Sequence, residues 1–168
     1  MLTSAVSTAE NFVVLVSSRG EDHASLRNIF HGSQWTLLDA WNVSDGLRLI
    51  SPNSSDIAVV ICGYGSQKCD WKLVLEALDK MAIPPKLIVS YWQANEGILA
   101  EVLDFGAYDL LLGAPFDSRE VLRMTQSAWC ARNNATLSGV APRKAVGLEM
   151  GEGRSAYGRS TGKSRAYD

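Results

Sequence analysis

The sequence has no hydrophobic run long enough to cross a membrane and no large excess of charge of either sign. Its longest apolar stretch runs from Ile57 to Cys62, far short of the roughly 18 residues that a membrane-spanning helix needs. The formal net charge is −2 over 168 residues, so no overall field attracts nucleic acid or an anionic membrane. The first eleven residues have neither a basic start nor a long apolar stretch, so no secretory signal is expected. These absences predict a cytoplasmic protein that binds neither membranes nor nucleic acids.

Cysteine and histidine are scarce. Cys62, Cys69 and Cys130 are odd in number and lack a paired short spacing, which argues against a disulfide framework or a zinc site. His23 and His31 have no acid or cysteine to complete a ligand set, so both are interpreted as solvated surface residues. No Gly-x-Ser-x-Gly, His-Glu-x-x-His or P-loop motif occurs. We therefore expect no metal, no cofactor, no catalytic residue and no enzymatic activity.

Short apolar runs instead alternate with helical spacing along most of the chain. Unbroken, often β-branched runs are typical of strands buried on both faces, and apolar residues three and four apart are typical of amphipathic helices. The expected strands cover 12–16, 35–38, 57–62, 87–89 and 108–112. The expected helical stripes cover 26–30, 43–50, 73–81, 98–103 and 121–129.

The ends of these elements carry their own signals. Asp70 is expected to cap the third helix, and Asp117 with Glu120 forms a capping box before the fifth. Gly106 is expected to end the fourth helix. Strict alternation of strand and helix predicts parallel strands joined by right-handed crossovers.

The predicted fold class is therefore α/β, a flavodoxin-like doubly wound sheet of five parallel strands in the order 2-1-3-4-5, with helices on both faces. One domain is expected over residues 11–133, preceded by a flexible N-terminus over 1–10. The segment 134–168 is rich in glycine, serine, arginine and lysine, and is expected to form a disordered, polar, basic tail.

Ligands of such a sheet bind at the carboxyl ends of the strands, near the point where the strand order reverses. The residues expected there are listed in chain order: Ser17, Ser18, Cys62, Gly63, Ser90 and Ala114. None of them is charged. Glu21 and Asp22 follow the first strand, but they are expected inside the first helix, where they complement its N-terminal dipole.

Several local sequences resemble the receiver domain of bacterial response regulators, over roughly residues 12–132. Ile88-Val89-Ser90 resembles the fourth strand with its terminal serine or threonine, and Phe105-Gly106-Ala107-Tyr108-Asp109 resembles the "GA" turn and the strand after it. Ala114-Pro115-Phe116 resembles the "KPF" turn with its lysine replaced, and Asp70-Trp71 matches the opening of helix 3. The order and spacing of these matches carry the resemblance.

The resemblance implies a phosphotransfer site from which most of the chemistry is missing. A receiver uses a carboxylate after strand 3 as nucleophile toward a phosphohistidine, two acids after strand 1 for Mg²⁺, a lysine for the phosphate, and a serine or threonine as switch. The nucleophile position falls on Gly63, with Cys62 as the alternative, and the acid pair on Ser17 and Ser18. The lysine position falls on Ala114, and Ser90 keeps the switch residue. The resemblance therefore implies a pseudo-receiver that is not phosphorylated.

Two functions remain open at this point. The first is a phosphorylation-independent pseudo-receiver in two-component phosphorelay signalling, which binds a histidine kinase, a downstream effector or a second copy through helix 4, strand 5 and helix 5 (residues 95–132). Tyr91, Trp92 and Phe116 are candidate contacts there. The second is a small-ligand or redox sensor that uses the neutral crevice at the strand ends, with Cys62 as a possible reactive thiol.

Overall fold

The computed structural model describes residues 11–52, 55–65, 68–93, 96–113 and 115–138. Strands and helices alternate without exception along this part of the chain. The strands are β1 (Asn11–Val16), β2 (Trp35–Ala40), β3 (Ile57–Gly63), β4 (Lys86–Tyr91) and β5 (Asp109–Leu112). The helices are α1 (Gly20–Phe30), α2 (Val43–Ile50), α3 (Trp71–Asp79), α4 (Glu96–Asp104) and α5 (Ser118–Leu137).

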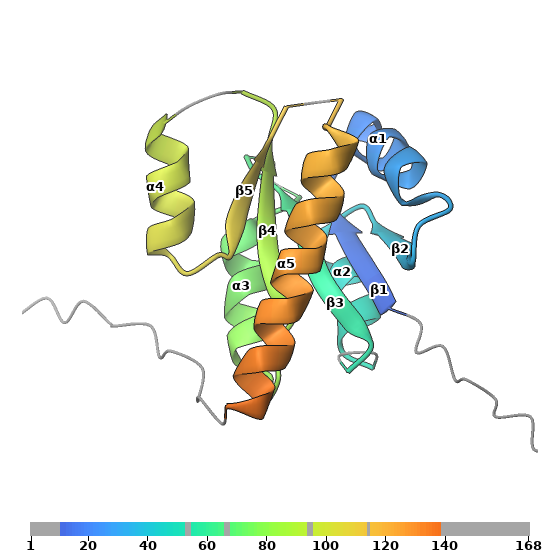
Figure 1. Cartoon of the computed structure of the whole chain (residues 1–168). Helices are drawn as coiled ribbons and strands as arrows, with labels where there is room; N and C mark the ends of the chain where they lie inside the picture. The colour runs from blue at the N-terminus through green and yellow to red at the C-terminus, as the bar shows by residue number, and fades with distance from the viewer. Residues whose placement is uncertain (1–10, 53–54, 66–67, 94–95, 114, 139–168) are drawn as a thin grey trace, which may run out of the picture.

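The strands form one parallel sheet in the order β2-β1-β3-β4-β5. Figure 1 shows β3 near the middle of the sheet, with α5 crossing its front face. Every residue of β3 is buried, as its unbroken apolar run requires. The predicted fold class is confirmed in both strand order and strand direction.

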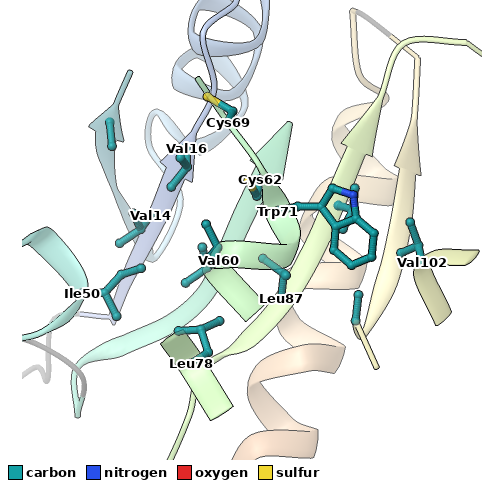
Figure 2. Close-up of a cluster of buried hydrophobic side chains, with 14 of the residues drawn as sticks. Val14, Val16, Ile50, Val60, Cys62, Cys69, Trp71, Leu78, Leu87 and Val102 are labelled. Atoms are coloured by element: carbon teal, nitrogen blue, oxygen red, sulfur yellow. The ribbon is translucent and has the colours of Figure 1, made fainter. Parts of the chain in front are cut away.

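The sheet separates two hydrophobic clusters because successive side chains of a strand point to opposite faces. Val14, Val16 and Cys62 face α2, α3 and α4 in one cluster (Figure 2). Val13, Leu15 and Ile61 face α1 and α5 in the other. Helices therefore cover both faces of the sheet, as the sequence predicts.

Asp70 and Asp117 are the N-caps of their helices as expected, and one helix stripe differs. Asp70 accepts a hydrogen bond from the Lys72 backbone N–H at 2.9 Å, and Asp117 caps α5. Leu73, expected on the buried face of α3, is instead 52% exposed, and Trp71 takes the buried position. The buried residues of α3 are Trp71, Val74 and Leu78, so Val74 and Leu78 lie on the inward face as expected.

Helix α5 continues to Leu137, past the domain boundary expected at residue 133. The predictions for residues 1–10 and for 139–168 lie outside the described residues. No helix in the described part of the chain is both long and apolar enough to cross a membrane.

Candidate functional site

The carboxyl ends of the three central strands bring Ser17, Gly63 and Ser90 together. Val16 pairs with Cys62, and Gly63 pairs with Ser90, so the residue after β1 lies beside the end of β3. These three residues and Ser18 line one crevice. The sequence predicted this grouping because parallel strands end at the same edge of a sheet.

Cys62 does not contribute to the crevice. Cys62 is fully buried and faces α2 and α3 in the apolar cluster (Figure 2), and it does not line the crevice. Burial, with smaller contributions from Cys69 and Asp70, raises the pKa of its thiol, so the reactive thiolate is disfavoured. Ala114 lies outside the described residues.

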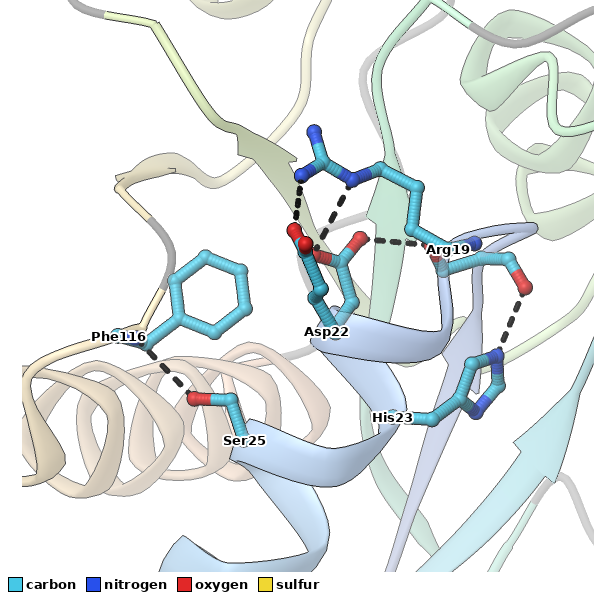
Figure 3. A network of polar contacts seen from close by, with 7 residues as sticks. Arg19, Asp22, His23, Ser25 and Phe116 are labelled. Atoms are coloured by element: carbon cyan, nitrogen blue, oxygen red, sulfur yellow. Dashed lines mark hydrogen bonds and ion pairs between the residues drawn. The ribbon is translucent and has the colours of Figure 1, made fainter.

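Asp22 corrects the expectation that the crevice is neutral. Its side chain is almost fully buried, lines the crevice and accepts a hydrogen bond from Ser17 Oγ at 2.7 Å. Arg19 Nε lies 3.9 Å from its other carboxylate oxygen (Figure 3). Side chains on a helix tilt toward its N-terminus, so an acid in the first turn of α1 reaches back over the end of β1. This tilt is the feature of the sequence from which the position of the Asp22 side chain could have been predicted. The expectation that Asp22 only complements the helix dipole was incomplete.

Gly63 is enclosed by the same polar groups. A Cβ atom at this position would lie 3.2 Å from Ser17 Oγ and 3.8 Å from Asp22 Oδ2. The first distance is tighter than an ordinary van der Waals contact, so a larger residue here requires Ser17 to move. The crevice is therefore shaped around a glycine at the position that the resemblance assigns to the nucleophile.

Side chains fill most of the remaining crevice. The enclosed space is about 10 Å³, roughly enough for one water molecule. The Arg19 guanidinium lies 5.4 Å from the ring centre of Trp92, and Phe116 is buried against the crevice. The Oγ atom of Ser90 is buried and has no hydrogen-bond partner among the described residues.

The aromatic residues near this edge have different roles. Phe116 is only 7% exposed, and its backbone N–H donates to Ser25 Oγ at 3.1 Å, so it packs inside rather than offering a contact surface. Trp92 is half exposed. Of the three aromatic residues suggested as contacts, Trp92 is the most accessible to a partner.

His23 is buried, which corrects its interpretation as a solvated residue. It is 2% exposed, and its Nδ1 lies 2.7 Å from Asp39 Oδ1. Its Nε2 lies 2.8 Å from the Ser17 carbonyl oxygen, a contact that Figure 3 shows from the His23 ring. Arg27 also binds Asp39, at 2.7 Å. His23 was missed because its partner Asp39 lies 16 residues away on β2. His31 is exposed, as predicted.

A second polar network runs from the crevice to α4. The Tyr64 hydroxyl donates to Glu101 Oε2 at 3.2 Å, and Lys72 Nζ lies 2.7 Å from Glu101 Oε1. The hydrogen bond from Lys72 lowers the pKa of Glu101 below its usual value. Lys72 also lies 4.1 Å from the ring centre of Phe105. Helices α3 and α4 are thus joined beside a crevice residue, Tyr64.

No family model and no curated protein matches the sequence, but many solved structures match the fold. The signal receiver domain of an HD domain-containing protein from Pseudomonas fluorescens Pf-5 matches with a TM-score of 0.66 at 20% identity, over 81% of this chain and 98% of that chain. A response regulator receiver domain protein from Clostridium thermocellum matches with a TM-score of 0.65 at 15% identity, over 74% and 98%. A chain of the CheX-CheY-BeF3-Mg+2 complex from Borrelia burgdorferi matches with a TM-score of 0.61 at 18% identity, over 71% and 89%. This chain has the receiver fold.

The residues at the strand ends of this receiver fold do not suit the Mg²⁺ that the resemblance implies. Mg²⁺ requires several oxygen ligands in near-octahedral geometry. Asp22 is the one carboxylate among the described lining residues, and it is already bound by Ser17 and approached by Arg19. No group of three or more potential ligands from histidine, cysteine, aspartate and glutamate occurs in the described ranges. The described lining of this crevice therefore does not fit a bound Mg²⁺ ion.

Proposed function

We propose that the chain is a cytoplasmic response-regulator-like protein of two-component phosphorelay signalling, which acts without phosphorylation by binding another protein. The receiver fold supports the signalling role, and the filled strand-end crevice supports the independence from phosphate. The observation that carries the proposal is the combination of Gly63 with the bonded group of Ser17, Asp22 and Arg19 around it.

The chemistry of phosphoryl transfer explains why this combination matters. Transfer needs an in-line nucleophile and positive charge on the transferring group. Glycine has no side-chain nucleophile, and the guanidinium of Arg19 is engaged by Glu21 at 2.6 Å and stacked near Trp92. The enclosed space of the crevice, about 10 Å³, holds roughly one water molecule.

The small size of the crevice also argues against a sensor that binds a small ligand there. Sites for small molecules commonly enclose about 300–1,000 Å³, and this crevice encloses about 10 Å³. A redox switch at Cys62 is also disfavoured, since the thiol is fully buried and its pKa is raised by that burial.

The proposed partner surface, here called the α4 face, consists of α4, β5 and the start of α5. On α4, Ile98 and Val102 are buried, whereas Leu99 and Leu103 are more than 40% exposed. Leu112 at the end of edge strand β5 is also exposed. An apolar patch of this kind is suited to a protein partner. The partner would be a kinase, an effector or a second copy of this chain.

Incubation of the purified full chain with a small-molecule phosphodonor and Mg²⁺ tests the loss of phosphorylation. We expect intact-mass spectrometry to find no phosphoryl adduct on the wild-type protein. The variant Gly63→Asp introduces a carboxylate, and we expect it to remain unmodified as well, because Asp22 is the one other carboxylate among the described lining residues and Mg²⁺ needs several oxygen ligands. An active receiver domain serves as the positive control. A phosphoryl adduct on the wild-type chain would overturn the proposal.

A further inference from the structure

The geometry around His23 requires two donors from one imidazole ring. Nδ1 faces the Asp39 carboxylate at 2.7 Å, and Nε2 faces the Ser17 backbone carbonyl at 2.8 Å. Both partners only accept hydrogen bonds. A neutral imidazole has one N–H and an imidazolium has two. The arrangement as it stands therefore fits the protonated ring.

The surroundings of His23 also favour a cation. The Trp41 ring stacks on the imidazole with centroids 3.9 Å apart and planes 20° apart, and the face of an indole ring attracts positive charge. The charged groups that face His23 are Asp39 from β2 and, through the same carboxylate, Arg27 from α1. At the end of β1, Ser17 offers its carbonyl, and Asp22 binds the Ser17 hydroxyl beside it.

Loss of one proton breaks a specific contact. The remaining proton stays on Nδ1, because a carboxylate is a stronger acceptor than a peptide carbonyl. Nε2 then presents a lone pair to the Ser17 carbonyl oxygen in a buried site. Two facing acceptors in such a site are unfavourable, so the Ser17 peptide must move away or admit water.

Ser17 connects His23 to the crevice through its own hydrogen bonds. Its hydroxyl donates to Asp22 at 2.7 Å and accepts from the Arg19 backbone N–H at 3.2 Å. Its side chain also lies against Gly63, where a Cβ atom would be 3.2 Å from Ser17 Oγ. A shift of the Ser17 peptide therefore changes the positions of Asp22 and Arg19, which line the crevice.

We propose that His23 is a proton-operated latch that holds the Ser17 carbonyl while the ring is doubly protonated and releases it when the Nε2 proton leaves. The proton passes to water or a buffer base, and no electrons are exchanged. Acidity thereby sets the geometry of the strand-end crevice without a phosphoryl group. The latch does not depend on the proposed signalling role, so either can fail alone.

A nuclear magnetic resonance titration of the full chain, labelled with ¹³C and ¹⁵N, tests the latch between pH 5 and pH 9. The chain has two histidines, so in the variant His31→Gln every histidine ring signal comes from His23. We expect both ring nitrogens of His23 to be protonated at the acid end. As the pH rises, the Nε2–H signal is lost, and the Ser17 carbonyl and Arg19 amide shift with the same midpoint.

Two results would overturn the latch. One is a His23 ring that keeps a single protonation state over the whole range. The other is a ring that loses its proton while Ser17 and Arg19 keep their shifts. The variant His23→Gln, with His31 intact, is expected to abolish the shifts at Ser17 and Arg19. If that variant fails to fold, the titration of the His31→Gln protein decides the question without it.

Discussion

Single side chains at the strand ends account for what the crevice can and cannot do. Gly63 offers no side-chain oxygen, and Asp22 offers its carboxylate to Ser17 rather than to a ligand. Ser90 retains a buried hydroxyl without a partner in the described part of the chain. A hydroxyl left unsatisfied in a buried site costs stability, which is consistent with space for one water molecule beside it.

Asp39 is the residue whose ionisation should be visible in the stability of the protein. Burial alone would raise the pKa of its carboxyl, but the hydrogen bonds from Arg27 and His23 outweigh burial, so the pKa lies below its usual value. The folded state thus holds the proton less tightly than the unfolded state does. The contribution of Asp39 to stability is complete above the ordinary carboxyl pKa of about 3.9 and is lost as the pH falls through the lower, folded value.

The variant Asp39→Asn tests this dependence on pH. At pH 7 we expect a loss of about 1–3 kcal/mol in the free energy of unfolding, because His23 and Arg27 lose a charged partner. Below the ordinary carboxyl pKa of about 3.9 the difference between wild type and variant should shrink, because the unfolded chain then binds a proton at Asp39, and the difference should vanish once the folded carboxyl is protonated as well. Urea unfolding at a series of pH values measures both effects.

The matched control is Asp79→Asn, at an exposed position at the end of α3. Its free energy of unfolding should follow that of the wild type at every pH. If the free energy of unfolding of Asp39→Asn stays below that of the wild type by a constant amount down to pH 2, the charge of Asp39 is not the cause of the loss in stability.

At the scale of elements, helix α2 lies against the sheet through a glycine. A Cβ atom on Gly46 would lie 2.5 Å from Cγ2 of Val16, which is fully buried in β1. Valine is stiff about χ1, so the contact cannot be relieved by a simple side-chain rotation. The close approach of α2 to β1 therefore depends on the absence of a side chain at position 46.

The variant Gly46→Ala should destabilise the protein despite the better helix propensity of alanine. Overpacking of a core commonly costs about 1–3 kcal/mol, and the gain in propensity is about 1 kcal/mol. We expect a net loss of about 1 kcal/mol, measured by urea or thermal unfolding. Gly20→Ala in α1 is the control, since nothing lies within 4 Å of a Cβ there, and it should be neutral or stabilising. Equal effects of the two variants would contradict the role of the Gly46 contact.

For the molecule as a whole, two polar networks connect the strand-end crevice to other parts of the fold. His23 and Asp39 connect it to α1 and β2, and Tyr64 and Glu101 connect it to α4. The exposed residues Leu99 and Leu103 of the α4 face lie on the same helix as Glu101. A receiver scaffold of this kind can present a binding surface without any reaction at the strand ends.

The double variant Leu99→Glu/Leu103→Glu tests the α4 face. We expect at least a tenfold weaker association with its partner, because 1.4 kcal/mol corresponds to a factor of ten and a buried carboxylate costs more than that. Sedimentation measures association with a second copy, and titration calorimetry measures binding to a purified kinase or effector. Circular dichroism checks that the variant is folded.

Leu73→Glu is the matched control, because Leu73 is 52% exposed on α3 and lies outside the α4 face. We expect Leu73→Glu to bind the partner with the same affinity as the wild-type protein. If Leu73→Glu disrupts association and the double variant leaves it intact, the partner binds elsewhere on the molecule.

The local pattern of the sequence was enough to predict the fold and the three residues that meet at the strand ends. Unbroken apolar runs alternating with helical stripes dictate a parallel doubly wound sheet, and parallel strands bring Ser17, Gly63 and Ser90 to one edge. These consequences follow from periods of two and 3.6 residues along the chain. The assignment of those residues to receiver roles stays a prediction.

Only the tertiary structure decided that Asp22 and His23 are buried and which polar partners they have. Both lie on the buried face of α1 together with Leu26 and Phe30, and this helix packs against β2 and α5. The burial of His23 also needs Asp39, which the fold brings across from β2. A polar residue can be buried when a distant partner satisfies it, and the sequence near His23 contains no sign of that partner.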